Sequence, residues 1–246
     1  MIQNALVFSS LKILDGTIAA LARKIRGPIT HVATRDAVAA LTFDDGPDPE
    51  FTPRLLEILD RHQARATFFM IGENARRHPN LVRRVAQARH VIGNHSWNHS
   101  VFPSLTRRER RAQIKACASA IAPYGQRLFR PPQGYHNLAS HLDALWLGYK
   151  VVNWNVAVDD WCSLDADWMA GRLMSQISPG SVILLHDGLC DPVGDQYLDR
   201  GPMLKAVNIL LSNLGHHFSF VTIPELLQHG RPQRADFFWK PDATLE

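Results

Sequence analysis

The residues best suited to chemistry are titratable side chains that directly follow apolar runs. Asp44 and Asp45 come after the apolar run at 37–43 and are followed by Gly46 and Pro47. Two adjacent carboxylates at the end of an extended segment point to different sides, so they can serve different partners. The Gly-Pro turn lets the backbone approach a bound group closely, although the same residues are also common in solvated turns. The two aspartates alone therefore do not distinguish an active site from a solvated turn, and other residues are needed.

A histidine pair follows another apolar segment. His95 and His99 are four residues apart, and in a helical segment their imidazoles would share one face. This spacing suits two ligands of one metal ion, although two surface histidines are the more common explanation. Asp45, arriving from a different segment, would complete a set that leaves coordination positions open for water and substrate. The combination predicts a catalytic metal site.

Three further segments end in groups with acid–base or binding chemistry. His186 ends the apolar run 181–185, where an imidazole suits general acid or base catalysis near neutral pH. Arg130 could hold a carboxylate in one orientation, and the Pro-Pro-Gln-Gly turn after it could present backbone N–H groups to an oxyanion. Asp160 and Trp161 offer a carboxylate and an aromatic wall for a sugar. Each group alone has an ordinary structural explanation, but their coincidence at segment ends favours an active site.

The elements that must position these residues alternate between strands and helices. We expect strands at 37–43, 66–71, 90–93, 128–130, 150–156, 181–186 and 218–223. We expect helices at 53–62, 80–88, 106–122, 137–147, 165–177 and 203–214, and a short last helix from Pro224. Thr106 and Glu109 form a predicted capping box. About seven strand–helix units predict one α/β domain with parallel strands, whose functional groups gather at the carboxyl ends of the strands.

The composition narrows the class of protein. The chain has 246 residues, of which 46% are hydrophobic and 20% charged, which excludes a disordered or collagen-like protein. Three widely spaced cysteines without a C-x-x-C motif argue against a disulfide framework. The formal charge of +4 is mild, and the paired arginines at 83–84, 107–108 and 110–111 are interpreted as solvated helix faces. We therefore expect no nucleic-acid partner.

The N-terminal segment has an amphipathic helical pattern. Apolar residues recur at steps of three and four from Val7 to Ile25, with Lys12 and Arg23 among the basic residues between them. The pattern fits a helix packed on the domain, an interfacial helix on an anionic membrane surface, or an uncleaved export signal, and it lacks the layout of a signal peptide. We divide the chain into a helical segment (1–36), a central domain (37–230) and a tail (231–246).

The central domain resembles the polysaccharide deacetylases of carbohydrate esterase family 4, which share the NodB homology domain. Five sequence motifs of that family are matched in order: Thr42-Phe43-Asp44-Asp45-Gly46; His95, Ser96 and His99; Arg130, Pro132 and Gly134; Asp160-Trp161; and Leu184, His186 and Asp187. The resemblance implies an α/β fold, a distorted parallel (β/α) barrel, to which this chain would add an N-terminal helix. It also implies a hydrolase that removes the N-acetyl group from an amino sugar and releases acetate.

The resemblance also implies roles for the individual residues. Asp44 would be the catalytic base, oriented by Arg130, and His186 the catalytic acid, tuned by Asp160. The implied metal ligands, for Zn²⁺ or another divalent ion, are Asp45, His95 and His99. The implied substrate contacts are the Gln133 backbone N–H at the oxyanion, Trp161 as an aromatic wall and Leu184 at the acyl methyl. Two positions depart from the family pattern: Gln133 replaces an aromatic residue, and Ala157 replaces an acidic one.

Other functions remain open at this level. The same residues would serve an N-formyl or O-acetyl sugar, and a non-catalytic carbohydrate-binding protein would also keep the fold. Because no cleavable signal precedes the N-terminal stripe, we expect a cytoplasmic protein. Residues 1–26 would attach it to the inner face of the membrane, near a small or lipid-linked acetylated sugar.

Overall fold

The computed structural model describes residues 27–190 and 192–236. The strands are β1 (Ile29–Ala33), β2 (Val38–Asp44), β3 (Ala66–Met70), β4 (Val91–Asn94), β5 (Gly125–Phe129), β6 (Lys150–Val151), β7 (Val182–His186), β8 (Ser219–Phe220) and β9 (Arg231–Arg234). The helices are α2 (Phe51–Arg61), α3 (Gly72–Arg77), α4 (Pro79–Gln87), α5 (Arg107–Ala120), α6 (Leu138–Trp146), α7 (Ala166–Gln176), α8 (Gly201–Leu214) and α9 (Ile223–Leu226).

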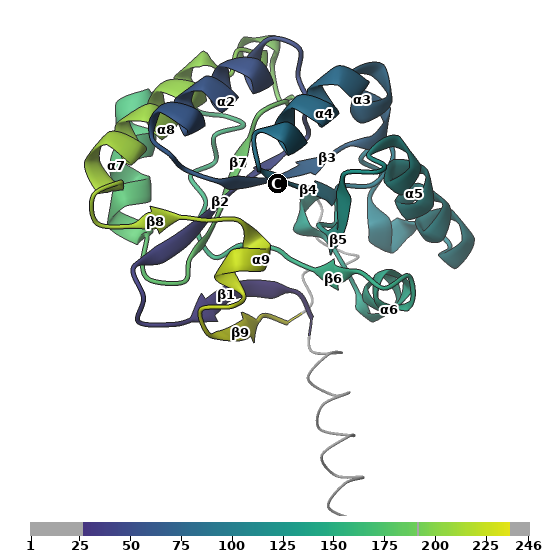
Figure 1. Cartoon of the computed structure of the whole chain (residues 1–246). Coiled ribbons are helices and arrows are strands. Elements are labelled where there is room, and N and C mark those ends of the chain that lie inside the picture. The colour runs from purple at the N-terminus through teal and green to yellow at the C-terminus, as the bar shows by residue number, and fades with distance from the viewer. Residues whose placement is uncertain (1–26, 191, 237–246) are drawn as a thin grey trace, which may run out of the picture.

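Seven strands form one sheet that curls into a half-barrel (Figure 1). The strand order is β6-β5-β4-β3-β2-β7, with β8 beside the start of β2, and the strand pairs are parallel. The segment after β6 bends toward the other edge, where Val156 bridges to Ile183 of β7. The predicted distorted parallel barrel is confirmed.

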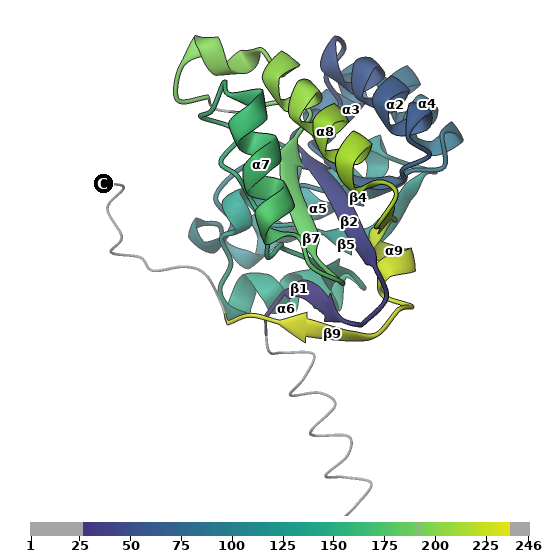
Figure 2. The same cartoon turned by 90° about the vertical axis from the view of Figure 1, so that its left-hand side faces the viewer.

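The strands at the centre of the sheet are apolar because helices cover them. All seven residues of β2 and all five of β3 are buried, as expected for parallel strands enclosed on both faces. The larger core joins these strands to α2, α7 and α8 through residues such as Leu55, Leu173 and Leu210, and Figure 2 shows these helices against the sheet. This packing fixes the carboxyl ends of β2 and β7 side by side.

Local capping explains where several helices begin. The predicted capping box of α5 is present: Thr106 accepts from the Glu109 N–H, and Glu109 accepts from the Thr106 N–H at 2.7 Å. Asp165 caps α7 by accepting from the Trp168 N–H at 2.9 Å. These side chains satisfy N–H groups that the first turn of a helix leaves without intrahelical partners.

At the edges of the fold, the structure differs from what the sequence predicts. Residues 29–33, within the segment interpreted as helical, form β1, which pairs antiparallel with β9 from the predicted tail. Strand β6 has two residues instead of the predicted seven, because after it the Asn153 N–H donates to the Ile29 carbonyl. Helix α3 was not predicted. The apolar stripe from Val7 to Ile25 lies outside the described residues. None of the helices that are described is long and apolar enough to cross a bilayer.

Candidate active site

The predicted site residues meet at the carboxyl edge of the sheet. Asp44 is the last residue of β2 and lies beside His186, the last residue of β7, in the parallel register. His95 follows β4 directly, and Arg130 follows β5. Successive parallel strands thus deliver these side chains to one place, as the sequence analysis predicted.

Asp45, His95 and His99 form a candidate metal centre. The Oδ1 atom of Asp45 lies 3.4 Å from His95 Nε2 and 3.5 Å from His99 Nε2. Ligand atoms about 2.0–2.2 Å from a tetrahedral Zn²⁺ are separated from one another by about 3.3 Å. The two distances therefore match what one bound ion needs.

The hydrogen bonds around these three residues support the same assignment. His95 Nδ1 lies 2.8 Å from the carbonyl oxygen of Arg130 and must donate to it, which leaves the Nε2 lone pair facing Asp45. Asp45 Oδ2 accepts from the Cys190 N–H at 2.8 Å. Asp45 Oδ1 is buried and has no hydrogen-bond partner among the described residues. A buried carboxylate oxygen of this kind fits a metal ligand.

The histidine pair is held by a turn and not by a helix. Ser96 and His99 have φ of 67° and 60°, in the left-handed region that non-glycine residues seldom adopt. The Asn94 side chain accepts from the Ser96 N–H at 3.0 Å, and the Ser96 hydroxyl accepts from the His99 N–H at 3.1 Å. The helical explanation of the spacing is therefore wrong, although the two rings do converge.

Burial and neighbouring charges set the protonation of the ligands. Burial alone would raise the pKa of Asp45, but the neighbouring His95, His99 and His186 rings lower it well below its ordinary value. Burial lowers the pKa of His99, against the opposing effect of Asp45. An ionised carboxylate and a neutral imidazole are the forms that bind a metal ion.

Arg130 fixes Asp44. Its Nη1 lies 2.7 Å from Asp44 Oδ1 and 2.8 Å from the Thr42 hydroxyl, and its guanidinium also donates to the carbonyls of Val152 and Asn153. Both members of this ion pair are buried. Because Arg130 occupies Oδ1, Asp44 Oδ2 turns toward the metal centre and lies 3.7 Å from His95 Nε2. The predicted orienting contact is present.

His186 is held by Asp160 and by an arginine that the sequence analysis missed. Its Nδ1 lies 2.9 Å from Asp160 Oδ1, and its backbone N–H donates to Oδ2 at 3.0 Å. Arg200, fully buried, pairs with Asp160 Oδ2 and donates to the carbonyls of Asp160 and His186. Arg200 precedes α8 without any motif around it, so only the three-dimensional structure reveals this contact.

Neighbouring carboxylates raise the pKa of His186. Burial opposes the charged imidazolium, but the charge and hydrogen bond of Asp160, followed by the charges of Asp45 and Asp44, outweigh burial and raise the pKa to about 9. The imidazole is therefore protonated at neutral pH and can act as an acid. Its ring also meets Trp161 edge-on, with the centroids 5.6 Å apart.

Asp187 supports the turn that carries Asp45. It is buried, it accepts from the Thr52 hydroxyl, and burial raises its pKa to about 7. A Cβ atom on Gly46 would come within 2.6 Å of Asp187 Cγ, so only glycine fits beside this carboxyl group. The glycine of the first motif is thus required by a close approach.

Leu184 and Gln133, two of the predicted substrate contacts, are each close in the sequence to a residue of the site. Leu184 is buried on β7, two residues before His186, so the two side chains share one face of the strand. Gln133 is exposed in a turn, with φ of 58°. These positions agree with the expected roles in substrate binding, which stay predictions.

Known proteins share this fold and these motifs. A family model described as polysaccharide deacetylase matches residues 31–152. A peptidoglycan-N-acetylglucosamine deacetylase of Bacillus cereus is 42% identical over 202 residues, 80% of this chain and 71% of the relative. A chitooligosaccharide deacetylase of Sinorhizobium fredii is 36% identical over 156 residues, 62% of this chain and 72% of the relative. The chain belongs to the polysaccharide deacetylase family.

A solved structure extends this likeness to the backbone. A peptidoglycan N-acetylglucosamine deacetylase crystallised with an N-hydroxybenzamide compound has a TM-score of 0.74 and 34% identity, covering 83% of this chain and 94% of that chain. The predicted enzyme class, a polysaccharide deacetylase-type hydrolase, is confirmed.

Proposed function

We propose that this protein hydrolyses the N-acetyl group of an N-acetylated amino sugar, with a divalent ion, Zn²⁺ in the simplest case, held by Asp45, His95 and His99. One observation carries the proposal. The buried, unpartnered Oδ1 of Asp45 faces two histidine Nε2 atoms at 3.4 and 3.5 Å. A fixed carboxylate and an imidazole flank this centre on neighbouring strands, at Asp44 and His186.

The two flanking groups divide the proton transfers between them. A divalent ion at this centre would polarise the amide carbonyl and lower the pKa of a bound water to about 7. Asp44, fixed through Oδ1 by Arg130, uses Oδ2 to take the proton of the attacking water. His186, whose pKa is raised to about 9, protonates the departing sugar amine. The Gln133 N–H stabilises the oxyanion.

The substrate class is supported by the relatives. The two named above are deacetylases of peptidoglycan N-acetylglucosamine and of chitooligosaccharide, which favours an N-acetylated glycan over an N-formyl or O-acetyl sugar. Gln133, which replaces an aromatic residue of the family pattern, changes the wall beside the sugar. We expect it to affect substrate preference more than the chemical step.

Product analysis tests the proposal. The purified protein, loaded with Zn²⁺, is incubated with N-acetylated, N-formylated, O-acetylated and lipid-linked sugars, and products are identified by mass spectrometry. We expect acetate and a free amine from the N-acetylated sugars, and at least about 100-fold less of both from Asp44→Asn. Acetate released from esters alone would replace the amide assignment, and no product from any sugar would favour the non-catalytic alternative.

The location of the reaction is a separate proposal. Attachment of residues 1–26 to an anionic membrane, and action on the cytoplasmic side, stay predictions from the sequence. The panel above bears on them indirectly, because a preference for lipid-linked sugars supports a membrane-bound substrate.

A further inference from the structure

Helix α6 exposes a row of large apolar side chains. Leu138, Leu142 and Trp146 are four residues apart and therefore lie on one face of the helix. They are 46%, 41% and 65% exposed. Single exposed apolar residues are ordinary, but a contiguous row is typical of an interaction surface.

Helix α5 places a row of basic side chains next to it. Arg107, Arg111 and Lys115 have the same spacing of four residues, and Arg108 is exposed beside them. The two rows adjoin, because the Arg111 guanidinium carbon lies 3.9 Å from the centroid of the Trp146 ring. Like charges four residues apart repel each other, so this basic row slightly destabilises α5. We call these seven residues the α5–α6 face.

The buried acid beneath this face does not neutralise it. Asp143 accepts from Arg110 at 2.7 Å and from Arg111 at 2.8 Å, and Arg107 lies 3.6 Å away. Three guanidinium groups thus share one carboxylate. The face keeps a net positive charge beside its apolar row.

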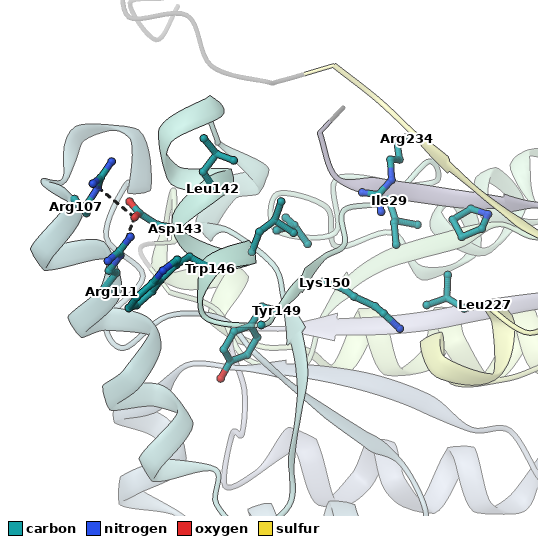
Figure 3. A pocket seen from close by; sticks show the side chains of 14 residues that line it. Ile29, Arg107, Arg111, Leu142, Asp143, Trp146, Tyr149, Lys150, Leu227 and Arg234 are labelled. Carbon is teal, nitrogen blue, oxygen red and sulfur yellow. Dashed lines mark hydrogen bonds and ion pairs between the residues drawn. The ribbon is translucent and has the colours of Figure 1, made fainter. Parts of the chain in front are cut away.

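A cavity beside this face is also lined by apolar and basic side chains, and it reaches toward β1 and β9. It has a volume of about 1020 Å³, and Figure 3 shows Trp146 and Leu142 at one side of it and Lys150 and Arg234 at the other. Asp143 is the one acidic residue among those that line it. None of the predicted catalytic, metal or substrate residues lines this cavity.

We propose that the α5–α6 face docks on an anionic lipid surface. The basic row complements anionic headgroups, while Leu142 and Trp146 enter the boundary between headgroups and acyl chains. A nucleic acid would match the charge and leave the apolar row in water. Residues 1–26 of the chain do not complement the face, because their four basic residues and single acidic residue give them the same sign of charge.

Vesicle sedimentation of the full-length protein tests the proposal. The vesicles contain either phosphatidylcholine alone or equal parts of phosphatidylcholine and phosphatidylglycerol. The charge variant is Arg107→Gln/Arg108→Gln/Lys115→Gln. We expect it to bind the anionic vesicles roughly 100-fold more weakly than the wild type, since each basic side chain near such a surface contributes about a factor of five. Binding of the wild type should weaken with salt.

A matched variant controls for net charge. Arg61→Gln/Arg83→Gln/Arg84→Gln removes three exposed basic residues from α2 and α4, and we expect it to bind like the wild type. Because residues 1–26 are present in every variant, binding carried by that segment alone would leave the charge variant unaffected and overturn the proposal.

A second variant separates lipid from other polyanions. Leu142→Ser/Trp146→Ser keeps every charge and removes two of the three side chains of the apolar row. We expect it to lose most binding to anionic vesicles. Unchanged binding to the vesicles would show that charge alone carries the interaction, and insertion of the apolar row into lipid would be wrong. Circular dichroism and deacetylase activity confirm that each variant is folded.

Discussion

Asp44 and His186 are register partners on neighbouring parallel strands, β2 and β7. The two proton-transferring groups of the proposed reaction are therefore joined by the backbone hydrogen bonds of the sheet and not by a flexible loop. Each is then fixed by its own buried partner, Arg130 for Asp44 and Asp160 for His186. This arrangement separates the base and the acid while holding both against the metal centre.

The adjacent aspartates should have separable roles. We expect Asp44→Asn to retain the metal and lose activity by about 10²–10⁴-fold, the range for removal of a general base. His99→Ala should lose both metal and activity, because one of three ligands is gone. Metal analysis of the purified variants distinguishes the two results. An Asp44→Asn protein that arrives without metal would show that the roles are assigned wrongly.

The basic limb of the pH profile should come from His186. We expect kcat/KM to fall on the basic side as His186 loses its proton. Asp160→Asn removes the charge that most strongly raises the pKa of His186, so the basic limb should move to lower pH. A basic limb that does not move would remove Asp160 from this role.

Arg200 should act in the opposite direction from Asp160. Arg200→Gln removes a positive charge close to His186, so electrostatics alone moves the basic limb upward. The hydrogen bonds that fix Asp160 are lost as well, so kcat should decrease. Measured pH profiles of the two variants test this pair of signs. If the basic limb moves to lower pH in both variants, the lost hydrogen bonds outweigh the lost charge of Arg200.

The raised pKa of His186 also predicts how stability depends on pH. The folded-state pKa is about 9, against 6.5 for the ordinary group. The stabilisation is fully present below pH 6.5 and is lost as the pH rises through 9, at about 1.4 kcal/mol for each unit of pKa difference. Urea unfolding of the wild type should show this loss. His186→Gln, which cannot titrate, should show a flatter dependence over the same interval.

Gly46 should be intolerant of any side chain. A Cβ atom there meets Asp187, so Gly46→Ala must displace the turn that carries Asp45. We expect reduced metal retention and activity. Gly171→Ala is the control, because nothing lies within 4 Å of its Cβ position in α7. That substitution should stabilise the protein by about 0.5–1 kcal/mol, as measured by denaturant unfolding.

The sequence predicts the site better than it predicts the edges of the fold. Buried strands such as β2 are continuous apolar runs, and the chemical groups follow them, so both can be recognised from residue order. Arg200 and the pairing of β1 with β9 depend on contacts between distant segments. The polar sequence Arg231–Arg234 has no strand pattern of its own and is extended because Ile29–Ala33 pairs with it.

The turn at His95–His99 shows a different kind of limit. The spacing of the two histidines suggests a helix, and the conclusion that they converge is correct, but the backbone achieves it with left-handed residues at Ser96 and His99. Side-chain acceptors at Asn94 and Ser96 hold that conformation. The residue types were enough to predict that the two histidines converge, but they did not predict the backbone conformation that brings them together.

The pairing of β1 with β9 has a practical consequence. The two ends of the described chain lie together, with Arg234 donating to the Gly27 carbonyl at 2.8 Å and the Ala235 N–H donating to that of Pro28 at 3.2 Å. Strands β1 and β9 lie together at the lower edge of the molecule in Figure 1, and neither contains a predicted site residue. A tag, a carrier domain or a solid support attached at either end would leave the mouth of the site open to a bulky polymer. Residues 27 and 236, beside β1 and β9, are therefore the attachment points that this geometry favours.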